Sequence, residues 1–73
     1  MAKFEAKTEV TGVVALIDTK IGDRIESGDP VLFIESMKMQ IPVLIEEAGT
    51  LRQIMVAKGD AVAEGQVVAI LES

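Results

Sequence analysis

The sequence predicts an all-β fold, in which about eight short strands form two four-stranded antiparallel sheets, packed as a sandwich or flattened barrel with pseudo-two-fold symmetry. Three observations support this prediction. The apolar runs are short and rich in β-branched side chains. Glycines separate these runs, as they do in turns between strands. Finally, segments 9–36 and 46–73 align without a gap at a constant offset of 37 residues.

The repeat is visible residue by residue. Nine of the 28 aligned pairs are identical, whereas unrelated segments of ordinary composition share about 2 of 28. The identical pairs are Glu9/Glu46, Gly12/Gly49, Ile17/Ile54, Gly22/Gly59, Asp23/Asp60, Gly28/Gly65, Val31/Val68, Glu35/Glu72 and Ser36/Ser73. Three of these pairs are glycines, which indicates shared turns. We therefore expect residues 1–73 to form one domain of two equivalent halves, since two repeats are too few for a solenoid.

The first half shows the strand pattern clearly. The β-branched run 12–17 is followed by a turn at Gly22-Asp23, and the apolar run 31–34 follows a second turn at Gly28. Only a few residues separate the two glycine turns, so the strand between them must be very short. Each half is expected to contribute four strands.

The second half repeats this arrangement. Run 49–56 precedes a Gly-Asp turn, another short segment and the run 67–71. The last run is too short for a buried helix, and its β-branched content favours a strand. Run 41–45 comes before them and contains Pro42, which cannot donate to a strand ladder and therefore predicts an edge strand or a bulge.

Composition excludes several classes of function. The 73 residues include 7 basic and 12 acidic side chains, giving a formal net charge of −5, and the basic residues are spread along the chain. A nucleic-acid site needs clustered Lys and Arg, so we expect no nucleic-acid partner. The apolar runs are far shorter than the about 20 residues of a membrane-spanning helix, and the first ten residues do not resemble a secretory signal. We therefore expect no membrane insertion and a cytoplasmic location.

The residue types that most enzymes use are also missing. The sequence contains neither histidine nor cysteine, which excludes a Ser-His-Asp triad, a Cys-His pair and thiolate or imidazole metal sites. The acidic residues lack EF-hand spacing. The duplicated Gly-Asp-x-x-x-x-Gly pattern, at 22–28 and 59–65, lacks the Gly-Lys-Ser/Thr of a phosphate loop and is typical of turns. We therefore expect no catalytic residue and no metal site.

The connection between the two halves differs from the other turns. Residues 35–40, Glu-Ser-Met-Lys-Met-Gln, contain no glycine, asparagine or aspartate, although tight hairpins favour these residues because their backbone requires positive φ. Turns that lack the usual turn residues are often functional sites, so this turn is a candidate functional site. The 37-residue offset makes the two chain ends equivalent to this turn. We therefore expect Lys38 at one end of the molecule and the termini at the other.

Lys38 is the candidate functional residue of this turn. An unmodified lysine is cationic at neutral pH and a poor nucleophile, and a hairpin-tip lysine near Glu35 lacks the burial or cationic neighbours that would activate it. Catalysis by Lys38 itself is therefore not expected. If another enzyme acylates its Nζ, the resulting amide carries a reactive group on a long flexible arm, and the protein supplies position.

The residues around Lys38 resemble a known attachment motif. Glu35-Ser36-Met37-Lys38-Met39 is similar to the Glu-Ala/Ser-Met-Lys-Met motif of biotin carboxyl carrier domains, and the glycine turns and the repeat extend the resemblance over essentially the whole chain. The resemblance implies that Lys38 is biotinylated and that Met37 and Met39 are recognised during modification and carboxylation. It also implies a flattened barrel of two four-stranded sheets, with the lysine on a hairpin tip.

The resemblance further implies three partner enzymes. A biotin protein ligase would transfer biotin from biotinyl-adenylate to Lys38. A biotin carboxylase would then carboxylate the attached biotin, and the arm would deliver the carboxyl group to a carboxyltransferase. The domain would be a non-catalytic part of a biotin-dependent carboxylase, decarboxylase or transcarboxylase.

Several alternatives remain open. Lipoyl domains share the fold but usually have Asp before the lysine and Ala after it, so Met37 and Met39 favour biotin. A third hypothesis is an unmodified interaction domain that binds through the two methionines, which either pack inward or form an adaptable recognition patch. Glu35 is equivalent to Glu72 and is interpreted as mainly structural, with a charge that also bears on recognition. Ser36 belongs to the same candidate site.

Overall fold

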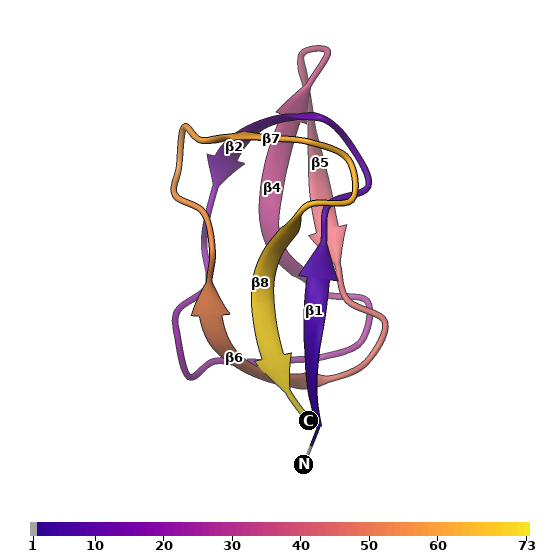
Figure 1. Cartoon of the computed structure of the whole chain (residues 1–73), viewed down its shortest axis with the longest axis vertical. Helices are drawn as coiled ribbons and strands as arrows, with labels where there is room; N and C mark the ends of the chain where they lie inside the picture. The colour runs from indigo at the N-terminus through magenta and orange to yellow at the C-terminus, as the bar shows by residue number, and fades with distance from the viewer. Residues whose placement is uncertain (1) are drawn as a thin grey trace.

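Strands are the only regular elements in the computed structural model, which describes residues 2–73 (Figure 1). They are β1 (Lys3–Lys7), β2 (Gly12–Leu16), β3 (Arg24–Ile25), β4 (Pro30–Ser36), β5 (Met39–Leu44), β6 (Gly49–Ile54), β7 (Ala61–Val62) and β8 (Val67–Glu72). Each run assigned from the sequence overlaps one of these strands, and the short segments between glycine turns form the two-residue strands β3 and β7. The all-β prediction is confirmed. No helix in this range is long and apolar enough to cross a membrane.

The strands form two antiparallel sheets. Sheet A has the order β1-β8-β6-β3 and sheet B the order β5-β4-β2-β7. Within the described range, no strand of one sheet pairs with a strand of the other, so the molecule is a sandwich and not a closed barrel. Each sheet contains strands from both halves of the sequence, because β1 and β3 join β6 and β8, while β7 and β5 join β2 and β4. β5 is an edge strand, as Pro42 predicted.

An approximate two-fold relation links the two sheets. The 37-residue offset places β1 on β5, β2 on β6, β3 on β7 and β4 on β8, and it thereby converts one sheet into the other. Backbone hydrogen bonds repeat with the offset: the Gly28 amide donates to the Ile45 carbonyl at 2.9 Å, and the Gly65 amide donates to the Thr8 carbonyl at 2.8 Å. The sequence repeat is therefore a repeat of backbone structure.

The core between the sheets is aliphatic. Its residues are Ala6, Val14, Ile25, Val31, Leu32, Ile34, Val43, Ile45, Leu51, Val62, Val68, Ala69 and Leu71. Full burial of a Val, Leu or Ile side chain contributes roughly 1.5–3 kcal/mol relative to exposure. The buried hydroxyl of Thr8 donates to the Val10 carbonyl at 2.9 Å. No buried side-chain N or O atom in residues 2–73 lacks a hydrogen-bond partner, so the core carries no unsatisfied polar group.

The two Gly-Asp motifs form equivalent turns. Gly22 and Gly59 have φ values of 98° and 94°, a region that favours glycine. The Asp23 carboxylate accepts a hydrogen bond from the Lys20 backbone amide at 2.9 Å, and the Asp60 carboxylate accepts one from the Ala57 backbone amide at the same distance. Each aspartate thus closes its own turn. The turn interpretation of these motifs is confirmed.

The β4–β5 hairpin and the chain ends lie at opposite ends of the molecule (Figure 1). The molecule measures 36 × 18 × 17 Å, and the hairpin turn projects beyond the sheets along the long axis. At the other end, the Ser73 amide donates to the Ala2 carbonyl at 2.9 Å, which holds the two ends of the described chain together. The expected separation of Lys38 from the termini is therefore present.

Candidate cofactor-attachment site

The turn that carries Lys38 is a two-residue hairpin with an unusual backbone. Ser36, the last residue of β4, pairs with Met39, the first residue of β5, so Met37 and Lys38 form the whole loop. Their φ values are 53° and 66°, and within residues 2–73 they are the only non-glycine residues with positive φ. Two-residue loops of this kind require positive φ at both positions. Since that conformation costs roughly 1–2 kcal/mol for each L-residue, the surrounding hairpin must hold the turn in place.

The Lys38 side chain is exposed and has no assigned partner. It takes part in none of the three ion pairs within residues 2–73 and in none of the side-chain hydrogen bonds found there. The hairpin carries it past the ends of both sheets (Figure 1). The amine is therefore accessible to a large partner from the end of the molecule.

Met37 and Met39 lie on the surface on either side of Lys38. Met37 is 92% exposed and Met39 is 64% exposed. Inward packing, one of the two alternatives for these side chains, is therefore excluded. Two exposed methionines next to one lysine form a soft apolar surface around the amine. Exposed thioethers of this kind fit irregular surfaces well because their side chains are flexible and polarizable.

Glu35 and Ser36 lead into the turn. Glu35 is exposed and lies opposite Val13 on β2 and Gln40 on β5. Its equivalent, Glu72, is ion-paired with Arg52 at 2.8 Å, but the position equivalent to Arg52 is an alanine in the first half. None of the ion pairs in the described range involves Glu35. Its charge therefore faces solvent near the tip, while half-buried Ser36 closes the hairpin with Met39.

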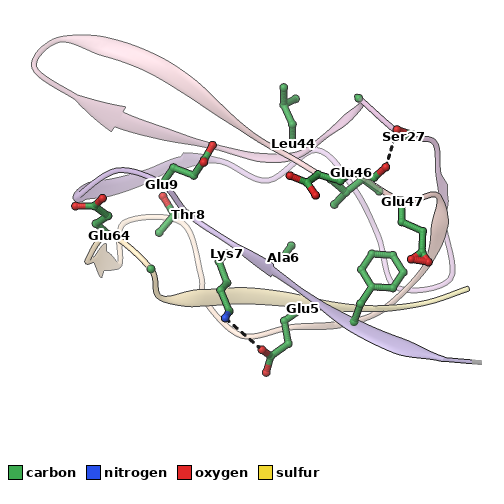
Figure 2. A pocket seen from close by; sticks show the side chains of 14 residues that line it. Glu5, Ala6, Lys7, Thr8, Glu9, Ser27, Leu44, Glu46, Glu47 and Glu64 are labelled. Atoms are coloured by element: carbon green, nitrogen blue, oxygen red, sulfur yellow. Dashed lines mark hydrogen bonds and ion pairs between the residues drawn. The ribbon is translucent and has the colours of Figure 1, made fainter.

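A separate groove runs between edge strand β1 and residues 44–47, at and beyond the end of β5, away from the hairpin tip (Figure 2). It is lined by Glu5, Glu9, Glu46, Glu47 and Glu64 among other residues, and by none of residues 35–40. Lys7 partly offsets these charges through an ion pair with Glu5 at 3.9 Å. No group of three or more potential metal ligands is found within residues 2–73.

The backbone strain at Met37 predicts a stabilising substitution. Met37→Asn is expected to raise the free energy of unfolding by about 0.5–1 kcal/mol, because asparagine tolerates the left-handed region better than other L-residues. Little packing is lost, since Met37 is almost fully exposed. Urea unfolding of the two proteins measures the difference. Met55→Asn serves as the control, because Met55 is also exposed but has no positive φ; an equal or larger gain there would contradict the explanation.

A two-sheet sandwich that presents a lysine on a projecting hairpin has the form of a carrier domain, to which another enzyme attaches a cofactor. Residues 4–72 match the family model described as "Biotin-requiring enzyme", and the chain belongs to this biotin/lipoyl attachment family. The family resemblance noted at Lys38 is thereby confirmed.

Relatives within the family carry descriptions of the same kind. The chain is 34% identical to the "Biotinylated protein TB7.3 homolog" of Mycobacterium leprae, over 92% of this chain and 94% of that protein. It is 37% identical to the "Biotin/lipoyl attachment protein" of Bacillus subtilis, over 81% of each chain. Among solved structures, the Kluyveromyces lactis urea carboxylase matches with a TM-score of 0.92 and 30% identity, over 99% of this chain but only 6% of that one. The fold is therefore also found inside a much larger carboxylase.

Proposed function

We propose that this chain is a biotin carboxyl carrier module and that Lys38 is its attachment residue. The observation that carries the proposal is the exposed Lys38 amine on a strained two-residue turn, with an exposed methionine on each side. The attachment step requires the unprotonated Nζ to attack the carbonyl carbon of biotinyl-adenylate. A C–N amide bond forms, the C–O bond to AMP breaks, and the amine proton passes to solvent. A separate biotin protein ligase supplies the activated acid.

The module's own contribution is position. When attached, biotin supplies a ureido nitrogen that can carry a carboxyl group between a biotin carboxylase site and a carboxyltransferase site. The hairpin holds the arm at one end of the sandwich, and Ala2 and Ser73 pair with each other at the opposite end (Figure 1). Tethering of this kind raises the local concentration of a carried group to the millimolar range for short flexible links. The likeness to a urea carboxylase supports partners of this class.

Lipoate is the alternative group. One relative is described as a "Biotin/lipoyl attachment protein", so the family includes proteins whose description names both groups. The two methionines that flank Lys38 favour biotin over lipoate. In the lipoyl version, lipoate would form an amide with the same exposed amine, and the attached lipoate would carry acyl groups between the enzymes of a dehydrogenase complex.

The intact mass of the protein isolated from its native cells tests the proposal. We expect one increment of biotinyl mass, located on the peptide that contains Lys38. A lipoyl mass increment on the same peptide would show that the attached group is lipoate and not biotin, and it would leave the carrier role of the protein in place. A fully expressed protein with no acyl group on Lys38 would reject both versions and favour an unmodified interaction domain.

A further inference from the structure

The outer face of sheet B is unusually apolar. Its central row consists of Leu16, Phe33 and Pro42, which are cross-strand partners on β2, β4 and β5. Val13 and Leu44 extend this row along the same strands. Val13, Leu16 and Leu44 are 42%, 41% and 51% exposed. We call these five side chains the apolar face.

The equivalent positions on sheet A are mostly polar. The 37-residue offset places the apolar face on Thr50, Gln53, Ile70, Glu5 and Lys7. These residues keep the same cross-strand relations, since Gln53 and Glu5 both lie opposite Ile70. Glu5 and Lys7 form an exposed ion pair at 3.9 Å. Two equivalent backbone surfaces thus differ in chemistry, one charged and one apolar.

This contrast provides an internal control for the role of the apolar face. The polar residues of sheet A show that the same strand geometry does not need apolar side chains on its outer surface. Neither Leu16 nor Leu44 belongs to the core or to the apolar residues packed against it. Contiguous exposed apolar side chains in a soluble protein mark interaction sites. The apolar face is therefore better explained by a partner than by folding.

The apolar face lies on the same strands as the Lys38 turn, with exposed Glu35 and Gln40 between them. Phe33 is three positions from Ser36, and Pro42 is three positions from Met39, which corresponds to about 10 Å along each strand. A specific protein interface of standard size takes about 800 Å² from each partner. Because the molecule is only 18 Å wide and 36 Å long, an interface of that area centred on this face extends to the hairpin tip.

We infer that the apolar face is the docking surface for the enzyme that acylates Lys38. The inference rests on the proposed function. That enzyme must hold the hairpin in its active site, and the adjoining surface of the same two strands is the area it can cover at the same time. The surface of the acylating enzyme should be apolar where it faces Leu16 and Phe33. It should be basic opposite the β5 edge, where Glu46 and Glu47 line the groove beside Leu44 (Figure 2).

A second copy of this chain fits the apolar face less well. A dimer formed there would also cover the hairpin tip, for the same reason of size. Lys38 would then be enclosed between two carriers, out of reach of the enzyme that must modify it. The accessible amine and the apolar face beside it are compatible in a monomer that binds one enzyme at a time.

The test exchanges residues between the two faces. Leu16→Gln and Leu44→Lys give sheet B the residues that sheet A carries at the equivalent positions, and they are combined in one variant. Val13→Thr is a milder second variant. Each protein is incubated in its unmodified form with purified biotin protein ligase, biotin and ATP, and biotinylation is followed by intact mass. We expect kcat/KM for the double variant to fall about tenfold or more, through a higher KM for the carrier, and Val13→Thr to lower it less.

The matched control is Thr50→Val combined with Gln53→Leu, which makes the polar face apolar and should leave kcat/KM unchanged. Urea unfolding midpoints confirm that every variant is folded. Equal kcat/KM for the wild type and both sheet B variants overturns the docking surface while leaving Lys38 as the attachment residue. A wild-type dimer in sedimentation that the sheet B variant converts to monomer also overturns it. A wild-type protein that the ligase leaves unmodified overturns the proposed function and the docking surface together.

Discussion

Lys38→Arg is expected to abolish covalent modification completely and to leave the fold intact. The guanidinium of arginine stays protonated and cannot form the amide that a lysine amine forms. The substitution lies on an exposed turn, outside the core, and keeps a long cationic side chain. Intact mass and a streptavidin blot of protein co-expressed with biotin protein ligase measure the loss. The free energy of unfolding measured in urea should stay within about 0.5 kcal/mol of wild type, as for most surface substitutions.

Lys58→Arg is the matched control for this experiment. Lys58 is also an exposed lysine at a tight turn, but it lies in the second half of the chain, between β6 and β7. Its variant should carry the same modification as wild type. A streptavidin signal that persists in Lys38→Arg and disappears in Lys58→Arg would move the attachment residue and reject the assignment.

Gly12→Ala is expected to destabilise the fold by about 2–3 kcal/mol. A Cβ atom at Gly12 would lie 2.3 Å from the carbonyl oxygen of Glu35 and 2.9 Å from Cγ2 of Ile34. The first of these atoms belongs to the backbone of β4, so strands β2 and β4 would have to separate. A loss of this size is a large part of the stability of a small domain. Urea unfolding with linear extrapolation measures it.

The pseudo-symmetry supplies a control for this prediction as well. Gly49 is equivalent to Gly12, but the nearest atoms to its added Cβ are ring atoms of Phe4, at 2.9 and 3.0 Å, and the backbone carbonyl oxygen of Glu72 lies at 3.1 Å, much further than the 2.3 Å found at Gly12. The ring is partly buried at the edge strand β1 and can move more easily than a backbone carbonyl. Gly49→Ala should therefore cost less than Gly12→Ala. The close-approach explanation would be wrong if Gly49→Ala proved the more damaging of the two.

The fold was predictable because two independent patterns agree. Short β-branched runs indicate strands, and the gapless repeat requires that whatever the first half forms, the second half forms again. The paired glycine turns also predicted a very short strand in each half, and these are the two-residue strands β3 and β7. Local patterns do not say which strands pair, however. β3 joins β6 and β7 joins β2, and those pairings depend on packing of the two halves against each other.

The candidate site was located from sequence, but its conformation was not. The junction of the repeat and the lack of turn residues singled out residues 35–40. Turn propensity alone argues against a two-residue loop at Met37-Lys38, because neither residue favours positive φ. The cross-strand ladder on both sides overrides that preference. The apolar face was missed because Val13 and Leu16 look like ordinary strand residues until the register shows that their equivalents are Thr50 and Gln53.

The interleaving of the two halves also governs when the molecule can fold. β8, the last strand, lies between β1 and β6 in sheet A and therefore joins the earliest strand of the chain to the second half. During synthesis, sheet A stays incomplete until β8 has left the ribosome. Long-range pairings of this kind slow folding because the connecting loops must close first. The hairpin that presents Lys38 is translated before β6, β7 and β8, so it gains its supporting sandwich only after these three strands have been made.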